Sequence, residues 1–99
     1  MTREEVISVL RQELPELRFQ YGVKRMGLFG SYARDKAADD SDVDIVVEFD
    51  RPIGLKFVAF ADHLETLLGR GVDILTPAGV KAIRLERVAR AITESVVYV

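Results

Sequence analysis

Residues 42–76 restrict the possible folds more than any other stretch, because they hold a strand pattern, a helix pattern and a second strand pattern in succession. Residues 42–49 become apolar and β-branched after their first acidic side chains, which is typical of a buried strand. Residues 55–68 carry apolar side chains at helical spacing and stop at Gly69, and residues 72–76 form the second strand pattern. Strand–helix–strand units connect right-handedly and make their two strands parallel. We therefore expect a parallel pair of strands with a helix packed against it.

The chain begins with another helix pattern. Thr2 and Glu5 have the spacing of a capping box, and apolar side chains follow them at helical intervals. Pro15 lacks the amide hydrogen that a helix interior needs, so we expect the helix to end at Leu14. A short second turn is expected to start at Pro15 and to close at Gly22.

The remaining segments complete a small α/β (α+β) architecture. The first strand is expected to pair antiparallel with the strand over 42–49, because the connection between them is short. The further elements expected are a strand over 23–29, a short helix over 31–36, a loop over 37–41, a helix over 79–93 and a β-prone apolar tail over 96–99. The pattern predicts a single domain over 1–99, with a three-stranded mixed sheet in strand order 1-2-3, flanking helices and the element order α-β-α-β-α-β-α.

Composition argues against several classes of function. The 99 residues carry 14 Lys+Arg against 16 Asp+Glu, a net charge of −2, which argues against a binder of duplex nucleic acid. The sequence has no cysteine, so disulfides, thiolate metal sites and cysteine nucleophiles are excluded. It also lacks a signal-peptide pattern and an apolar run of the roughly 18 residues that a membrane span needs. We therefore expect a cytoplasmic protein that does not bind membranes.

Acidic residues lie within both strands of the strand–helix–strand unit. Asp42 and Asp44 are two residues apart at the start of the strand over 42–49, so their side chains project from the same face. Asp73 is a third acidic residue, within the strand over 72–76, and pairing of the two strands would bring it close to Asp44. Neighbouring carboxylates repel unless a cation intervenes, and Mg²⁺ prefers carboxylate oxygens and keeps positions for substrate phosphates. The spacing also allows a simpler interpretation, in which Asp42 only begins its strand and Asp73 is a solvated edge residue.

Gly30 and Ser31 lie where a predicted strand passes into a short helix. Backbone amides and a hydroxyl group meet at such a junction, with the positive end of the helix dipole behind them, and this suits a phosphate group. Glycine also lets a ligand approach the backbone closely. A simple helix cap would use the same two residues, so the phosphate interpretation depends on the pair Asp42 and Asp44 that follows.

Together these residues resemble the motif of the DNA polymerase β-like nucleotidyltransferase superfamily. The matching segments are Gly-Ser-Tyr-Ala-Arg at residues 30–34 and Ser-Asp-Val-Asp-Ile-Val-Val at residues 41–47, with Asp73 one strand–helix–strand unit later. In its minimal form the pattern resembles the MNT proteins, which are antitoxin-type partners of HEPN-domain proteins in toxin–antitoxin pairs. The resemblance covers essentially the whole chain and implies the nucleotidyltransferase fold.

The resemblance also implies roles for individual residues. It implies two Mg²⁺ ions held by three catalytic carboxylates, those of Asp42, Asp44 and Asp73. It implies that Gly30 and Ser31 bind the triphosphate, and Arg34 would either reach a phosphate or form a salt bridge. The implied reaction transfers AMP from ATP to a tyrosine of a HEPN-domain toxin and thereby silences the toxin.

One departure from the motif keeps a second hypothesis open. Asp35 stands where such proteins usually carry glycine, and its charge near a triphosphate would weaken binding of the nucleotide. The intact Asp42, Asp44 and Asp73 favour the enzyme, but Asp35 keeps open an antitoxin that neutralises its partner by binding alone. A small-molecule nucleotidyltransferase of the aminoglycoside-modifying kind is a third hypothesis, but it would need an additional helical domain. The expected partners are ATP or another NTP, a HEPN-domain protein and, through the apolar tail, a second copy of the chain. His63 falls on the polar flank of its helix and is expected to be neither a ligand nor a catalyst.

Overall fold

A computed structural model of the chain describes residues 2–33, 42–77 and 96–99, with Ser31 described by its backbone alone. In chain order the elements are α1 (Arg3–Tyr21), β1 (Val23–Phe29), α2 (Gly30–Ala33), β2 (Val43–Phe49), α3 (Lys56–Leu68), β3 (Val72–Leu75) and β4 (Val97–Tyr98). The three predicted strands and the helix predicted over 55–68 are confirmed to within one residue at each end.

Several predictions concern residues beyond this description. The loop over 37–41 and the helix over 79–93 lie outside the described residues, and so do Arg34 and Asp35. The short helix predicted over 31–36 is observed only as α2, which begins at Gly30.

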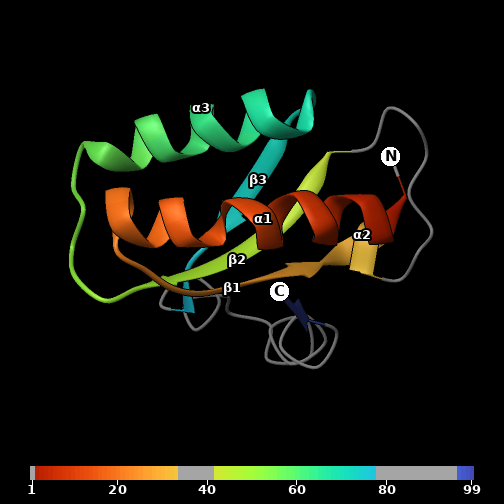
Figure 1. Cartoon of the computed structure of the whole chain (residues 1–99), viewed down its shortest axis with the longest axis horizontal. Helices are drawn as coiled ribbons and strands as arrows, with labels where there is room; N and C mark the ends of the chain where they lie inside the picture. Colours follow the sequence, from red (N-terminus) through yellow and green to blue (C-terminus); the bar gives the residue numbers. More distant parts are fainter. Residues whose placement is uncertain (1, 34–41, 78–95) are drawn as a thin grey trace, which may run out of the picture.

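The strands form one sheet in the order β3-β2-β1-β4. β1 is antiparallel to both β2 and β4, and β2 is parallel to β3, so the predicted mixed sheet and its order 1-2-3 are confirmed (Figure 1). The predicted number of three strands is wrong, because the apolar tail supplies β4 as a fourth. The tail pairs with the edge of β1, where the Val99 amide donates to the Met26 carbonyl at 3.0 Å. This pairing satisfies backbone groups that a free strand edge would expose.

α1 continues through Pro15, so the predicted end of this helix at Leu14 is wrong. Pro15 lies on the exposed side of α1, whereas Leu10, Leu14 and Leu17 on the other side are buried. Burying three leucines stabilises the helix by about 5 kcal/mol or more, which exceeds the cost of about 3 kcal/mol for proline in a helix interior. The helix ends as predicted at Gly22, which has the left-handed φ of 72°.

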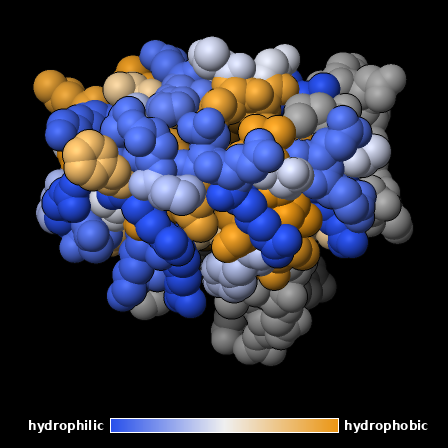
Figure 2. Space-filling view, viewed as in Figure 1, coloured by the Kyte–Doolittle hydropathy of each residue, from blue (hydrophilic) through white to orange (hydrophobic). Residues whose placement is uncertain are grey.

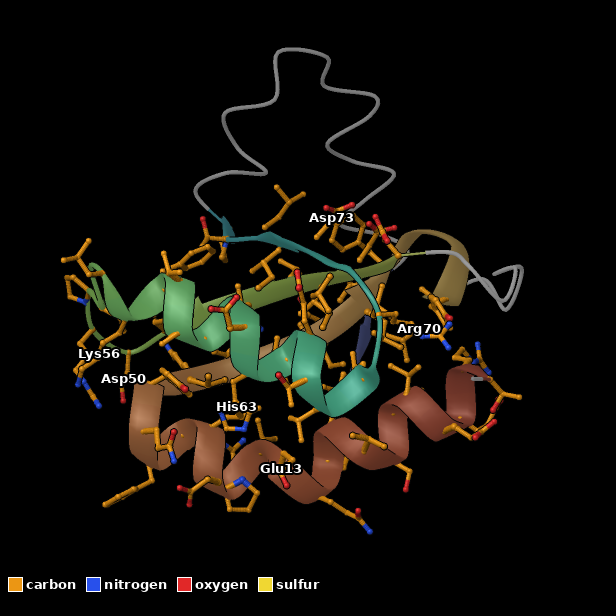
Figure 3. All side chains as sticks on the ribbon, turned by 90° about the horizontal axis from the view of Figure 1, so that it is seen from above. Glu13, Asp50, Lys56, His63, Arg70 and Asp73 are labelled. Atoms are coloured by element: carbon orange, nitrogen blue, oxygen red, sulfur yellow. The ribbon has the colours of Figure 1, made fainter. Side chains whose placement is uncertain are left out.

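α1 and α3 lie side by side on one face of the sheet (Figures 1 and 3). Their buried side chains meet those of β2 in a single core, which includes Val6, Leu10, Leu17, Val43, Ile45, Val47, Phe60 and Leu64. Because side chains alternate along a strand, the even-numbered residues of β2 point to the opposite face of the sheet. That opposite face carries Asp44, and the fold thereby separates the core from the candidate site.

The surface is mixed in character. Figure 2 shows hydrophobic areas interspersed among hydrophilic side chains on the face seen in Figure 1. In the part of the chain that the structure describes, the large apolar side chains with high exposure are Phe19, Leu55, Val58 and Tyr98. Within the same described residues, no helix combines the length and the apolar character that crossing a membrane requires.

Candidate functional site

The register of the sheet places Asp73 next to Asp44. These two residues are partners in the parallel pairing of β2 with β3, and directly paired residues of neighbouring strands project from the same face. Asp44 is half-buried, and Asp73 is exposed. Figure 3 shows Asp73 on the side of β3 that faces away from α1 and α3. The sequence-based expectation that strand pairing brings these two residues together is therefore met at the level of the backbone.

Asp42 lies at the same end of the sheet, immediately before β2. The amide of Val43 donates to the carbonyl of Gly71 at 2.9 Å, which ties the start of β2 to the turn before β3. A Cβ atom built on Gly71 would be only 2.5 Å from Oδ1 of Asp42, closer than real Cβ contacts allow. The missing side chain of Gly71 thus leaves the space that the Asp42 carboxylate occupies.

Gly30 leaves room for the Asp44 carboxylate, as Gly71 does for that of Asp42. It has a left-handed φ of 70°, which favours glycine, and a Cβ atom on it would collide with the Asp44 carboxylate. The sequence suggested that this glycine admits a ligand, and the structure shows that it also makes room for Asp44. Sequence reasoning missed Gly71, although the Gly-Val-Asp run at residues 71–73 held the signal.

The donor set of these residues suits a hard divalent cation, because all of it is carboxylate oxygen. Like charges on paired positions repel, and a cation between them would relieve that repulsion. Among the described residues, however, no three acidic, histidine or cysteine side chains are grouped closely enough to hold a metal ion. The metal-binding role of Asp42, Asp44 and Asp73 therefore stays a prediction.

Farther along the same face, Arg25 and Lys24 are paired with Glu48. Nε of Arg25 donates to Glu48 at 2.8 Å, and Nζ of Lys24 lies 3.6 Å from the other carboxylate oxygen. The hydrogen bond from Arg25 holds the pKa of Glu48 below its usual value.

α2 begins at the end of β1, beside Asp44. Two of its later residues, Tyr32 and Ala33, are contacted by arginines from other parts of the chain. Tyr32, which lies inside the motif over residues 30–34, is 1% exposed and belongs to the core. Its hydroxyl accepts a hydrogen bond from Arg70, and the carbonyl of Ala33 accepts one from Arg3 at 3.2 Å. Neither arginine contact could be predicted from the sequence, because the partners are at least 30 residues apart along the chain.

His63 lies in the helical layer, away from the carboxylate face. Its Nδ1 is 3.1 Å from the Tyr21 hydroxyl, and its Nε2 is 3.9 Å from a carboxylate oxygen of Glu13 (Figure 3). Its ring also meets that of Tyr21 edge-on, with 5.8 Å between centroids. These contacts join α1 to α3.

Comparison with known sequences gives matches along almost the whole chain. The sequence profile of a family described as nucleotidyltransferase domain matches residues 10–99. The protein adenylyltransferase MntA of Thermococcus cleftensis is 42% identical over 100 residues, and the alignment covers 100% of this chain and 97% of that protein.

Solved structures have a similar fold. One that is provisionally assigned as a minimal nucleotidyltransferase has a TM-score of 0.75 and 28% identity, and the match covers 98% of this chain and 95% of that chain. A crystal structure of a toxin–antitoxin with AMP-PNP has a TM-score of 0.53 and 23% identity, over 83% of this chain and 60% of that one. At this level of identity the second match shows a likeness of fold alone.

Proposed function

Since the chain belongs to the nucleotidyltransferase domain family, we propose that it transfers AMP from ATP to a hydroxyl group of a partner protein and acts as the antitoxin of a toxin–antitoxin pair. Membership of the family confirms the fold and the enzyme class expected from the sequence. The choice of AMP as the transferred group and of a protein as the acceptor follows the name of the relative from Thermococcus cleftensis.

The observation that carries the proposal is the pairing of Asp44 with Asp73 beside the start of α2. Two carboxylates at paired positions suit a cation, and Gly30 opens the segment that the sequence motif associates with phosphates. Nucleotidyl transfer needs a cation site and a phosphate-binding segment side by side, because the α-phosphorus lies between the acceptor and the departing β- and γ-phosphates.

Each site residue has a place in the proposed reaction. Mg²⁺, as two ions, would be held by Asp42, Asp44 and Asp73, and when bound it lowers the pKa of the acceptor hydroxyl and neutralises phosphate charge. The backbone at Gly30 and Ser31 binds and orients the triphosphate, and Arg34 contacts a phosphate oxygen. The acceptor oxygen bonds to the α-phosphorus, the bond to pyrophosphate breaks, and Asp73 receives the hydroxyl proton.

We place the acceptor hydroxyl on a tyrosine of a HEPN-domain toxin. The support for this is the resemblance of residues 30–34 and 41–47 to the minimal antitoxins of such pairs. A solved chain of the same fold occurs in a toxin–antitoxin structure with AMP-PNP, an ATP analogue. Adding AMP to a toxin tyrosine would add a bulky, charged group at its surface.

A second candidate function is neutralisation by binding alone. Two observations favour it. Asp35 adds a negative charge next to the motif, and among the described residues no three carboxylates stand ready to hold a metal. In that case the carboxylate face would be a contact surface, and the chain would silence its partner without modifying it.

Mass spectrometry on the reaction with the partner protein tests the proposal. The chain is incubated with Mg²⁺, one NTP at a time and the product of the neighbouring gene, and the partner is examined for a mass increase of one nucleotide. Asp44→Asn and Asp73→Asn are expected to reduce transfer by more than about 100-fold, because each removes a charge that acts on the reacting phosphate. Asp62→Asn, an exposed residue of α3, is the matched control and is expected to transfer at the rate of the unchanged protein.

The outcomes separate the two functions. Transfer that is lost in the Asp44 and Asp73 variants but kept in the control supports the enzyme. Tight binding and toxin inhibition without any added nucleotide support neutralisation by binding. Undiminished transfer by both site variants would remove the proposed mechanism.

A further inference from the structure

We propose that Arg70 is a positioning residue for nucleotidyl transfer, because it fixes α2 relative to the strand ends that carry the carboxylates. The inference rests on the proposed function of the site. Arg70 lies in the turn between α3 and β3, and Figure 3 shows it beside α2 and the start of α1. It does not belong to the motif that identifies the family from the sequence.

The contact between Arg70 and Tyr32 is the first step of the argument. Nη1 of Arg70 donates to the Tyr32 hydroxyl, and the guanidinium carbon lies 5.9 Å from the centre of the tyrosine ring. Tyr32 is 1% exposed, so its ring is fixed by the core around it. Arg70 therefore binds a residue of α2, Tyr32, that cannot shift without disturbing the core.

α2 depends on such contacts, because it has only four residues. A helix this short has no stability of its own, so tertiary contacts decide where it lies. Arg3 supplies a second contact, from its Nη1 to the carbonyl of Ala33 at 3.2 Å. Two arginines from separate elements thus hold the far end of α2, while Gly30 at its near end lies against Asp44.

The turn that carries Arg70 is also bound to the carboxylate side of the site. The carbonyl of Gly71 accepts from the Val43 amide at 2.9 Å, and Gly71 leaves room for the Asp42 carboxylate. Asp73 follows two residues later. The residue that follows Arg70 is thus hydrogen-bonded to Val43, next to Asp42, and leads into the strand of Asp73, whereas the Arg70 side chain contacts α2.

This double attachment makes Arg70 the link between the two halves of the site. In the proposed reaction, α2 holds the triphosphate and the carboxylates act at the α-phosphorus. The distance between α2 and the carboxylates must therefore match the in-line attack of the acceptor on the α-phosphorus. A misplacement of about 1 Å at such a site can reduce the rate by about 100-fold. Loss of the link is expected to change the chemical step more than it changes nucleotide binding.

Steady-state kinetics of AMP transfer test the link. Arg70→Met keeps the aliphatic stem and removes the guanidinium group, and Tyr32→Phe keeps the ring and removes the hydroxyl. Both variants are expected to lower kcat by about 10- to 100-fold while KM for ATP stays within about threefold. The double variant is expected to be no slower than the slower single variant, because both changes break the same contact. Arg70→Lys, which keeps a charged donor, is expected to recover part of kcat.

Hydrogen exchange supplies a measurement that does not depend on transfer. The amides of α2 are expected to exchange faster in Arg70→Met, with the amides of β2 unchanged. Arg11→Met is the control, since Arg11 is an exposed arginine of α1, and it is expected to change neither kcat nor the exchange of α2.

The results distinguish failure of the inference from failure of the proposed function. An unchanged kcat, or unchanged exchange of α2, in Arg70→Met overturns the inference. If kcat falls equally in all variants and in proportion to the folded fraction, Arg70 has a purely structural role, and this result also overturns the inference. If the unchanged protein transfers no AMP, the proposed function fails, and the exchange experiment still decides whether Arg70 fixes α2.

Discussion

Gly69 and Gly71 lie in the same turn, but a Cβ atom added to each would have different surroundings. Gly71 lies against the Asp42 carboxylate, whereas the space around Gly69 is open within 4 Å. Gly69 has a left-handed φ of 66°, and alanine there costs about 1 to 2 kcal/mol. The two positions therefore separate an effect on the site from an effect on stability.

Gly71→Ala is expected to lower AMP transfer by about 10-fold or more with little change in the free energy of unfolding, because its Cβ displaces the Asp42 carboxylate. Gly69→Ala is expected to lower the free energy of unfolding by about 1 to 2 kcal/mol and to leave the transfer rate alone. Denaturant unfolding and transfer assays measure the two quantities. Full transfer by Gly71→Ala would show that the position of Asp42 does not matter to the reaction.

At the residue scale, strand periodicity was enough to place the acidic residues of the site. Asp44 and Asp73 share a face because each lies within a strand whose alternation is visible in the sequence. The contact between Arg70 and Tyr32 could not be predicted, because it joins residues 38 apart whose distance depends on how α2 packs. A four-residue helix leaves no periodic pattern from which that packing could be derived.

At the scale of elements, the capping box of α1 gives the fold a dependence on pH. The Thr2 amide donates to the Glu5 carboxylate at 3.0 Å, and the Glu5 amide donates to the Thr2 hydroxyl at 3.2 Å. The hydrogen bond from the Thr2 backbone is the largest of the effects that lower the pKa of Glu5 from 4.5. A lowered pKa in the folded state means that the ionised form stabilises the fold.

This contribution is complete above the unfolded pKa of 4.5 and is lost as the pH falls through the lower folded value. Glu5→Gln, which resembles the protonated side chain, is therefore expected to be less stable than the unchanged protein at neutral pH. The difference should shrink as the pH falls below 4.5. Denaturant unfolding of both proteins across this range measures it, and a difference that stays constant with pH would contradict the assignment.

Pro15 shows where local rules fail at the scale of an element. The local rule ends a helix before proline, but α1 continues for six more residues, to Tyr21. Residues on both sides of Pro15 lie on the buried face, so ending the helix would remove Leu17 from the core. The leucine spacing in the sequence reveals this face. Whether burial of the leucines stabilises the helix by more than proline destabilises it can be judged only once the positions of α3 and the sheet are known.

At the scale of the whole molecule, the sequence predicted the order of strands β1, β2 and β3 and a β-prone tail over 96–99, but not the pairing of that tail with β1 as a fourth strand. The first three have four to seven residues each, enough for alternation and flanking breakers to be recognised. β4 has two residues, too few for any pattern. Its pairing depends on Gly27 of β1, whose partner in the register is Tyr98.

Gly27→Ala tests how this fourth strand closes the sheet. A Cβ at Gly27 would lie 2.6 Å from Cγ1 of Val96 and 3.0 Å from the carbonyl oxygen of Val97, so β4 must move. Overpacking of this kind is expected to cost about 1 to 3 kcal/mol and to speed exchange of the Val99 amide, which donates to Met26. Gly54→Ala is the control, because its left-handed φ of 54° makes alanine cost stability while nothing lies within 4 Å of its Cβ, so exchange at Val99 through movement of β4 should not change.

β4 and β3 are at opposite edges of the sheet, so a displaced β4 leaves the pairing of Asp44 with Asp73 in place. Gly27→Ala is therefore expected to lose stability while it keeps its rate of AMP transfer at temperatures where it is folded. Faster exchange at Val99 together with a lost rate would mean that the closing strand also supports the site. Unchanged exchange at Val99 would mean that β4 accommodates the extra methyl group without moving.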